Sequence, residues 1–561
     1  MNKKLTASFL ALMLLFSGCG SDKKIYDGGD DAQNTSEIYE NAVNIVLSDA
    51  GITVDGEKAS QNEEDAVYTA NDIVFYLEGQ DFTYGEGEEG DAHSQAEADG
   101  HTVVHITKPG TYALSGSLSR GQVAVDLGDD AEDDPDAVVT LVLSGVDITC
   151  EVAPSVIFYN VYECGEKDEE TASYEVDTSK AGANVIIADG TENNISGSYV
   201  AKIYDPDTVE LNEDGTEVIE AKKLHKYDAA FYSKMSMNVD GGALGSGVLN
   251  IDAENEGLDT ELHLTVNGGN INIESGNDGI NTNEDNISVT TINGGTVDIV
   301  VTGETGEGDG IDSNGWLVIN GGNVSASACS ISGDAGIDSD MGIYLNGGTV
   351  MAGGNMLDQI AGGQQTYAVF GFKDSQKGGE VITLKDSNGQ KAGEWAPVND
   401  YSILIVAGDL LAPGDYTLWQ GDTQLAGSAG MMGGGMRPGM MPQDGERFEM
   451  PEPNEDGTIT LPDGTVIDPE DMPEPDFDHK GNMPQPHIPG TQVPKRPESD
   501  ENFTVIPDEI PAGEGADKPS FGDGTFPGKG DRGQMTAAPI SPIFTIKEGG
   551  NMFSGITVYE G

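Results

Sequence analysis

The apolar residues of this chain fall in short runs that are separated by stretches rich in Gly, Asp and Asn. Residues 102–106, 138–143 and 184–187 are examples, and in the later runs apolar and polar positions alternate. Alternation with a period of two places one set of side chains on one face of a β-strand. Amphipathic helical patterns do not separate the runs, so the chain is predicted to be all-β.

An internal repeat organises the strands. The triplet Asn-Gly-Gly begins at Asn267, Asn293, Asn320 and Asn346, at spacings of 26, 27 and 26 residues. A coil of this length cannot bury its own apolar face, so equivalent strands must stack and close a continuous core. Propeller blades and leucine-rich repeats have longer units or helical segments. The repeat predicts a right-handed, single-stranded parallel β-helix over residues 66–365, in which these four Asn are expected to serve turns.

The pattern changes on both sides of the repeat. Residues 366–427, together with 543–561, predict a small antiparallel β cap over the open end of the helix, where strand edges would otherwise be exposed. Residues 428–542 hold 19 of the 25 prolines and are rich in Gly, Met and acidic residues, which predicts a disordered insertion between cap strands. An isolated terminal hairpin is the alternative for the last strands. Residues 20–65 are polar and acidic, and they predict a flexible tether.

The N-terminus has the layout of a secretory signal peptide. Two lysines precede an apolar run from Leu5 to Phe16, which is too short to span a membrane as a helix. Small residues directly before Cys19 resemble a bacterial lipobox, in which the cysteine becomes the lipidated first residue. Residues 1–19 are therefore predicted to be a lipoprotein signal peptide that leaves the protein lipid-anchored at the extracellular face of the cell membrane. An ordinary signal peptide that is cleaved nearby is the alternative.

Charge and cysteine content narrow the set of partners. The 27 Lys and Arg stand against 98 Asp and Glu, and a formal net charge of −71 would repel nucleic acid and anionic lipid headgroups. Any acidic partner would need metal ions as a bridge. Besides the N-terminal cysteine, only Cys150, Cys164 and Cys329 are present, too few for a disulfide framework or a zinc site. The first two could pair, and Cys329 is expected in the core.

A second motif, which we call the acidic motif, recurs inside the repeat, and in it acidic or amide residues flank Gly and one apolar residue. Its four copies are Glu256–Asp259, Asp278–Asn281, Asp309–Asp312 and Asp334–Asp338. If these positions are equivalent on adjacent coils, they lie about 4.8 Å apart. Two unit charges at that distance repel by roughly 1 kcal/mol in water and by about 3 to 4 kcal/mol at an effective dielectric of 20. Protons or cations must neutralise such a ladder, and oxygen ligands suit Ca²⁺. The predicted calcium ligands are Asp259, Asp278, Asn281, Asp285, Asp309, Asp312, Asp334, Asp338 and Asp340.

The acidic motif has a competing interpretation and two irregular copies. Asp and Asn are common in turns, but turn chemistry explains one acidic residue per coil and not two. Asn281 lies twelve residues before its triplet, whereas Asp259, Asp312 and Asp338 each lie eight residues before theirs. Ala335 inserts a residue into the last copy. The alignment of these two coils is therefore the part of the calcium prediction that the sequence supports least directly.

Two aromatic residues are candidates for sugar binding. Trp316 and Tyr344 fall at outward positions of neighbouring coils if the alternation holds. Aromatic rings in such places can support sugar rings. Partial burial under a loop is the alternative.

Catalysis is the main competing function. A polysaccharide lyase needs a Lys, Arg or other base beside the metal. Residues 241–365 contain no Lys or Arg and one histidine, His263, which is expected on a strand surface. Lys222, Lys223 and Lys226, which precede this region, leave a lyase open, and the many carboxylates leave glycoside hydrolysis open.

The order of these motifs resembles the calcium-binding β-helix lipoproteins of anaerobic bacteria that are described as carbohydrate-binding domain-containing proteins. The likeness covers residues 66–427 and 543–561, and it implies binding of plant cell-wall polysaccharides, cellulose or pectin-like polyuronates, with bound calcium. We therefore predict a non-catalytic polysaccharide-binding lipoprotein, with a calcium-dependent polysaccharide lyase and a surface adhesin or scaffold as alternatives. The segments that carry the likeness are Gly110–Gly116, Asp228–Lys234, Asp240–Gly242, the repeated motifs, and Leu411–Leu418.

Overall fold

The computed structural model describes residues 41–165, 167–212, 214–430 and 540–560, together with two short strands, β36 (Ile459–Thr460) and β37 (Val466–Ile467). The predicted signal peptide with Cys19, and most of the predicted tether and insertion, lie outside these residues. The all-β class is confirmed. The helix α2 (Gln95–Ala98) has four residues, and in the described part of the chain no helix is long and apolar enough to cross a membrane.

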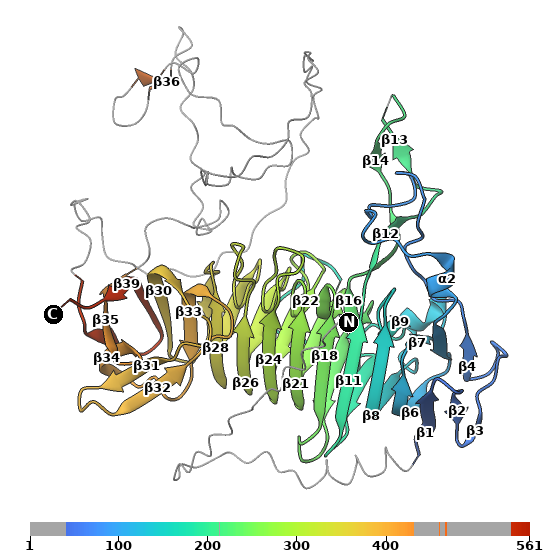
Figure 1. Ribbon diagram of the computed structural model, residues 1–561, viewed down its shortest axis with the longest axis horizontal. Coiled ribbons are helices and arrows are strands. Elements are labelled where there is room, and N and C mark those ends of the chain that lie inside the picture. Colours follow the sequence, from blue (N-terminus) through green and yellow to red (C-terminus); the bar gives the residue numbers. More distant parts are fainter. Residues whose placement is uncertain are drawn as a thin grey trace, which may run out of the picture. The chain divides into compact units, whose positions relative to one another are not determined.

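Three ladders of parallel strands form the main body (Figure 1). Each strand pairs with its equivalents before and after it in the chain, so the ladders run through successive repeats. The first ladder contains β1 (Val43–Ser48), β6 (Gly110–Leu118), β8 (Val139–Cys150), β10 (Ala183–Ile187), β17 (Met237–Gly241), β20 (His263–Val266), β23 (Val289–Ile292), β25 (Trp316–Ile319), β27 (Gly342–Leu345) and β29 (Ile360–Gly362).

The second ladder begins on the C-terminal halves of β6 and β8, and the third includes the first two copies of the acidic motif. The second continues with β11 (Glu192–Gly197), β18 (Val248–Ala253), β21 (Asn270–Ser275), β24 (Thr296–Val301), β26 (Asn323–Ser327) and β28 (Thr349–Gly354). The third contains β5 (Thr102–Ile106), β7 (Gly121–Asp126), β9 (Val156–Asn160), β16 (Ala229–Ser233), β19 (Glu256–Thr260) and β22 (Ile280–Thr282), with β4 (Val67–Ala70) antiparallel to β5.

The apolar positions of the repeat form one core between the ladders. Leu317 and Ile319 precede a turn, Val324 and Ala326 follow it, and all four are buried as the alternation predicts. Ile311 of the acidic motif is in the same cluster. The sheets are mixed, because antiparallel strands of the cap join the ladders. None of the sheets closes on itself. The parallel β-helix itself therefore stays a prediction.

Replacing a residue of this core should destabilise the fold strongly. We expect Leu317→Ala to lower the free energy of unfolding by about 2–5 kcal/mol, because the side chain is fully buried and its removal leaves a cavity. Val398→Ala is the matched control, since that side chain is half exposed and should change stability by about 0.5 kcal/mol or less. Urea unfolding measures both, and equal effects would contradict the assignment of Leu317 to the core.

The Asn-Gly-Gly triplets form turns that stack on one another. The Nδ2 of Asn293 donates to Oδ1 of Asn267 at 2.9 Å, and Asn320 and Asn346 continue the ladder at 2.9 and 2.8 Å. The last glycine of the second triplet, Gly295, has φ of +82°, and a Cβ there would lie 2.5 Å from a backbone oxygen of the preceding turn. The turn interpretation therefore accounts for both residue types.

The strands of the predicted cap follow the ladders. β28 pairs antiparallel with β33, so the cap continues the second ladder. One pair, β30 with β39, is parallel, which departs from the antiparallel expectation. β34 and β35 pair with β38 and β39, so the chain between residues 429 and 544 connects strands of one sheet. The strands are β30 (Tyr367–Gln376), β31 (Ile382–Asp386), β32 (Lys391–Trp395), β33 (Tyr401–Ala407), β34 (Gly414–Gln420), β35 (Thr423–Ala429), β38 (Phe544–Ile546) and β39 (Gly550–Val558).

The described residues of the predicted tether differ from the expectation. The strands β1, β2 (Thr53–Val54) and β3 (Glu57–Lys58) lie in this range, and β1 pairs in parallel with β6. Ile45 and Leu47 are buried in the main core. The apolar run in this range was too short to show a sustained alternation of apolar and polar residues. It forms a strand because it lies beside β6 and pairs with it.

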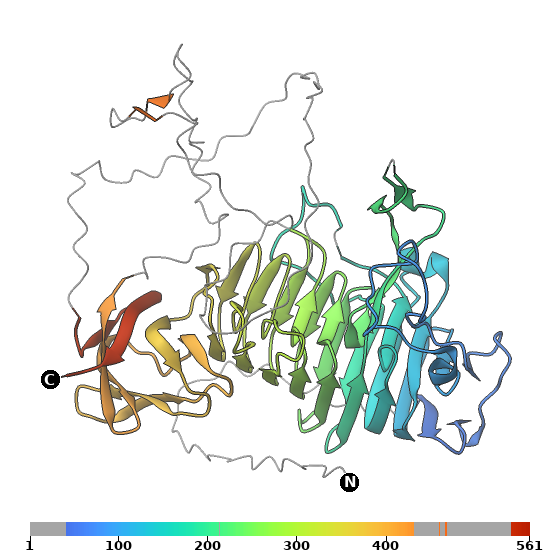
Figure 2. The same cartoon turned by 45° about the horizontal axis from the view of Figure 1, so that its top comes forward.

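An antiparallel arm interrupts the ladders between β11 and β16. It contains β12 (Val200–Tyr204), β13 (Glu210–Leu211), β14 (Val218–Glu220) and β15 (Lys223–Tyr227), and β12 pairs with β15. Figures 1 and 2 show the arm extending away from the ladders. The base of the arm, β15, lies beside the third ladder and forms one wall of the site described next.

Candidate metal and ligand site

The third ladder aligns the acidic motifs residue by residue. Asp259 pairs with Asn281 in β19 and β22, so the extra residues of that coil leave the motif in register. Further on, Ile280 bridges to Ile311, and the N–H of Asp338 donates to the carbonyl of Ile311. This alignment stacks Asp259, Asn281, Asp312 and Asp338 at one level of four successive coils.

The inserted residue of the last copy replaces a carboxylate. The N–H of Gly310 donates to the carbonyl of Ala335, which aligns Gly310 with Gly336 and therefore Asp309 with Ala335. The carboxylate of Asp334 lies one position earlier, where its Oδ2 accepts the N–H of Gly308 at 2.7 Å. The first acidic level therefore runs through Glu256, Asp278 and Asp309 and ends at Ala335.

Three carboxylates of the later coils come together. Asp309, Asp312 and Asp338 each offer one oxygen, and these oxygens lie within 4.8 Å of one another. Asp309 and Asp338 are buried. Asp278 lies beside them, and its Oδ1 accepts the N–H of Asp309 at 2.6 Å. We call Asp278, Asp309, Asp312 and Asp338 the carboxylate cluster.

Burial and like charge make the carboxylate cluster unfavourable in its ionised form. The pKa of Asp309 is raised to about 10, first by burial and then by the charges of Asp338, Asp278 and Asp312, although the Ala335 N–H lowers it. Burial, followed by the charge of Glu256, raises the pKa of Asp278 well above its usual range. At neutral pH the cluster must therefore bind protons or a cation.

Three oxygens of the earlier coils are buried without partners. Glu256 Oε2, Asp259 Oδ2 and Asn281 Oδ1 accept no hydrogen bond from any described residue. Asn281 Nδ2 donates to the other oxygen of Glu256 at 3.1 Å, and Asn283 Nδ2 donates to the other oxygen of Asp259 at 2.8 Å. Burial is the main cause that raises the pKa of both carboxyls. Each unsatisfied buried oxygen costs about 1–3 kcal/mol, and these oxygens suit a hard cation.

The predicted calcium ligands fall into two groups in the structure, those that contribute to the buried oxygens described above and those that lie outside them. Glu256 was not among them, although it occupies the first position of the acidic motif and its buried Oε2 has no hydrogen-bond partner among the described residues. Asp285 and Asp340 are exposed and lie outside the cluster of three. Asp285 accepts a hydrogen bond from Asn314 Nδ2 at 3.0 Å. These outer carboxylates border the site and are not part of its buried portion.

The two aromatic residues predicted to bind sugar do not form an open platform, because a loop lies over them, and their role in sugar binding stays a prediction. Trp316 is 9% exposed and packs with Val318 under Ala172 and Val176 of the loop between β9 and β10. The ring of Tyr344 stacks on Tyr174 of the same loop, with centroids 4.1 Å apart. A loop from an earlier coil thus covers the outward face, as the alternative proposed.

His263 is not on the surface either. It is 1% exposed, and its Nδ1 accepts the N–H of Val289 at 3.1 Å. Burial lowers its pKa to about 4. Gly165 lies against the ring so closely that a Cβ there would be 2.5 Å from it. The loop that contains Gly165 covers a face that the strand pattern alone would leave open.

The cysteines of the described residues are free. Cys150 and Cys164 do not form the disulfide that was left open, and Cys329 is buried as expected. Burial raises the pKa of the Cys150 thiol to about 12, which makes it a poor nucleophile and metal ligand.

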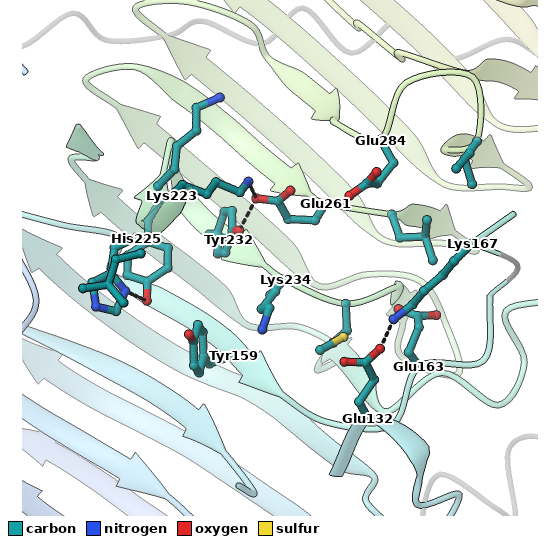
Figure 3. A pocket seen from close by; sticks show the side chains of 16 residues that line it. Glu132, Tyr159, Glu163, Lys167, Lys223, His225, Tyr232, Lys234, Glu261 and Glu284 are labelled. Carbon is teal, nitrogen blue, oxygen red and sulfur yellow. Dashed lines mark hydrogen bonds and ion pairs between the residues drawn. The ribbon is translucent and has the colours of Figure 1, made fainter. Parts of the chain in front are cut away.

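A pocket of about 470 Å³ lies between the arm and the third ladder (Figure 3). Strand β15 supplies one wall, and side chains of β9, β16 and the neighbouring loops supply the rest. A second hollow of about 350 Å³ shares Lys223 and Glu261 with the pocket and continues past Asn283 to Asn314. Because Asn283 donates to Asp259, this hollow runs along the outer side of the acidic motif. The pocket is lined by Glu132, Tyr159, Glu163, Lys167, Lys223, Leu224, His225, Lys226, Tyr227, Tyr232, Lys234, Met235, Glu261, Leu262, Glu284 and Ile287.

Comparisons with known proteins name one family. Residues 99–368 match the model of a family described as carbohydrate-binding domain-containing protein. A curated relative with the same description, from Acetivibrio thermocellus, is 29% identical over 174 residues, which are 31% of this chain and 45% of the relative. The chain thus covers less than half of that relative's length.

A solved structure is also similar. It is described as the polysaccharide lyase-like protein from C. thermocellum, a gadolinium derivative, and it has 20% identity and a TM-score of 0.31 over 57% of this chain and 90% of that chain. The resemblance expected from the sequence is confirmed, since the family model, which matches residues 99–368, and the curated relative both identify the carbohydrate-binding domain-containing protein family.

Proposed function

We propose that this protein is a non-catalytic cell-surface lipoprotein that binds polysaccharide through a calcium-bearing, right-handed parallel β-helix. The observation that carries the proposal is the set of buried, unpartnered oxygens of Glu256, Asp259 and Asn281 beside the carboxylate cluster. Buried acidic groups of this kind are rarely left without counter-charge. The family description supports carbohydrate as the ligand.

The strand pairing supports the β-helix. Three parallel ladders that each advance by one repeat are the pairing that a coil with three strands per turn would produce. Parallel connections in one sheet are right-handed in nearly all proteins, which supports the proposed hand.

Two sets of residues are proposed to hold calcium. Asp309, Asp312 and Asp338 form the first set, with Asp278 beside them, and Glu256, Asp259 and Asn281 form the second. Bound calcium would supply positive charge that neutralises these oxygens and attracts hydroxyl or carboxylate groups of a glycan. The chain's own contribution is to hold the oxygens in register on stacked strands.

The lysines nearest the acidic motif argue against a lyase. Burial lowers the pKa of Lys226, but its ion pair with Asp228, at 2.7 Å, is the largest of the effects that raise it, and the net shift is upward. Lys226 is therefore protonated at neutral pH and cannot accept a proton from a sugar. Lys223 is paired with Glu261 at 2.6 Å. A non-catalytic protein does not need a neutral base, so these charged lysines are compatible with a binding role.

Secretion and anchoring are proposed from the N-terminal sequence, where Cys19 would carry the lipid. This placement agrees with the large negative charge, since the anchor and not electrostatic attraction would hold the protein at the membrane. Mass spectrometry of the mature N-terminus from the native host tests it. A diacylglyceryl group on Cys19 is expected, and an unmodified N-terminus created by cleavage elsewhere would contradict the anchor.

Binding to polysaccharide should depend on calcium and should not be followed by cleavage. We expect the protein to sediment with insoluble plant cell-wall polysaccharide in calcium, to be released by a chelator, and to bind again when calcium is restored. An ultraviolet assay for unsaturated uronate products should stay at background. Binding that persists in chelator would contradict the calcium dependence, and product formation would favour the lyase.

A further inference from the structure

The pocket beside the arm brings four lysines together with four glutamates in a strongly acidic chain. Only 27 of the 561 residues are Lys or Arg, yet four lysines line this one pocket. They come from different parts of the chain: Lys223 and Lys226 from the arm, Lys234 from the end of β16, and Lys167 from the loop after β9. Figure 3 shows Lys223, Lys234 and Lys167 around the same hollow.

Three of these lysines are already neutralised. Lys167 pairs with Glu132, Lys223 with Glu261 and Lys226 with Asp228. Lys234 differs from them, because no carboxylate of the described residues lies within 4.0 Å of its ammonium group. Instead its Nζ lies 4.7 Å from the centroid of the Tyr159 ring (Figure 3). An ammonium group held in a pocket by an aromatic ring remains available to an anion.

The other walls of the pocket suit a sugar ring. Tyr159 and Tyr227 meet edge to face with centroids 6.2 Å apart, and His225 lies against both rings. Leu224 is 47% exposed at the rim. Aromatic and apolar surfaces pack against the C–H faces of sugars, while the carboxylates that line the pocket can accept hydrogen bonds from sugar hydroxyls.

The pocket also opens toward the acidic motif. The second hollow shares Lys223, Lys226, Glu261 and Glu284 with it and extends to Asn314, two coils beyond Glu261. Adjacent coils are about 4.8 Å apart, so the two hollows together span on the order of 10–15 Å along the ladder. A chain of a few sugar units can therefore occupy both, with one unit in the pocket.

We propose that the pocket binds a carboxylate-bearing sugar unit and that Lys234 is the residue that recognises the carboxylate. This inference rests on the proposed polysaccharide binding and names the unit that the site selects. A single cation without a carboxylate partner matches a single negative charge, and it offsets the repulsion that the acidic chain would otherwise exert on an acidic glycan. A neutral sugar offers Lys234 only hydroxyl oxygens and no opposite charge, so it gains much less from this residue.

The test compares two Lys234 variants of the full chain in calcium. The probes are a galacturonate oligomer and a neutral glucose oligomer of equal length, and calorimetry measures affinity. We expect Lys234→Gln to bind the galacturonate oligomer roughly tenfold more weakly, as for the loss of one charged hydrogen bond, and the neutral oligomer unchanged. Lys234→Arg should keep most of the affinity. Lys391→Gln, which changes an exposed lysine of β32, is the matched control.

Several outcomes would overturn the assignment. They are an unchanged galacturonate affinity in Lys234→Gln, an equal loss for both oligomers, and a loss in Lys234→Arg as large as in Lys234→Gln. If the wild-type protein binds neither oligomer nor any polysaccharide, the proposed function fails. If it binds galacturonate and Lys234→Gln does too, only this inference fails.

A measurement on the wild-type protein does not depend on how the variants fold. Amine-reactive labelling followed by mass spectrometry reports the accessibility of each lysine. The galacturonate oligomer should reduce labelling of Lys234 severalfold and leave Lys391 unchanged. Equal labelling of Lys234 with and without the oligomer would contradict the proposal.

Discussion

Removal of calcium should lower the melting temperature of this protein by on the order of 10 °C at pH 8 and by much less at pH 5. A ligand present at a thousand times its Kd stabilises the folded state by about 4 kcal/mol per site. In a domain of a few hundred residues each kcal/mol moves the melting temperature by about 2 °C. Two occupied sites would therefore produce a shift of this size.

The pH dependence follows from the direction of the pKa shifts. In the folded chain without metal, the pKa of Asp309 is raised to about 10, and those of Asp278, Asp259 and Glu256 are raised as well. In the unfolded chain these groups titrate near pH 4. Between these values the folded state holds protons that the unfolded state has released, so stability falls as pH rises, by about 1.4 kcal/mol per pH unit for each such group. Bound calcium would hold the carboxylates ionised and would remove this dependence.

Thermal unfolding in calcium and in chelator at pH 5, 6.5 and 8, at equal ionic strength, measures both effects. Magnesium is the control cation, because it requires near-octahedral geometry and gives up its water reluctantly, so it should stabilise less. A melting temperature that rises from pH 5 to pH 8 in chelator, or one that does not respond to calcium at pH 8, would contradict the proposed sites.

The repeat allowed the core residues and the register of the stacked strands to be predicted, because equivalent residues of successive coils lie next to each other in a stacked fold. The burial of Leu317 and Ile319 follows from alternation alone. Asn281 falls in register with Asp259 despite its longer coil, since the extra residues are accommodated after the motif, where the chain leaves the ladder. A sequence pattern that is repeated in a stacked fold therefore predicts which residues of adjacent coils are neighbours in space.

What the pattern could not predict is what covers the outward faces. Trp316, Tyr344 and His263 are outward or surface positions by alternation, yet a loop from an earlier coil lies over all three. That loop has no periodic signal of its own, and its course depends on anchors such as the hydroxyl of Thr178, which lies 2.8 Å from Asn238 Oδ1. Outward direction and solvent exposure are different properties, and only the first can be read from alternation.

The lysine pocket was missed for a related reason. The sequence showed that the acidic repeat contains no Lys or Arg, and it left Lys223 and Lys226 only as possible bases of a lyase. The antiparallel pairing of β12 with β15 returns the chain to the third ladder and places these lysines beside the acidic motif. The alternation of Lys223, His225 and Tyr227 indicated a strand. The strand that pairs with it lies about twenty residues earlier, on the other side of a polar segment.

The sharpest test of the carboxylate cluster is Asp309→Asn, which should move stability in opposite directions with and without calcium. Asp309 lies beside Asp312 and Asp338 and accepts the N–H of Ala335, so the amide keeps the shape of the side chain and removes its charge. Without metal, the amide should raise the melting temperature at pH 8 by a few degrees, because it removes the cost of protonating a carboxyl whose pKa is raised by burial and by the neighbouring charges. With calcium, the lost ligand charge should abolish most of the stabilisation at this cluster.

Asp298→Asn is the matched control for that variant. Asp298 lies on β24 of the second ladder, where its neighbours on the adjacent strands are Asn272 and Ser325 and not acidic residues. Burial raises the pKa of this carboxyl too, but no neighbouring negative charge adds to the shift. The change in charge is identical, so any effect of net charge alone should appear equally in both variants. If Asp309→Asn and Asp298→Asn respond alike to calcium, the stabilisation is a general effect of the acidic surface. If only Asp309→Asn loses the response and gains stability in chelator, the unfavourable charge of this cluster is what calcium neutralises, and the stacked register that produces the repulsion is also what creates the site.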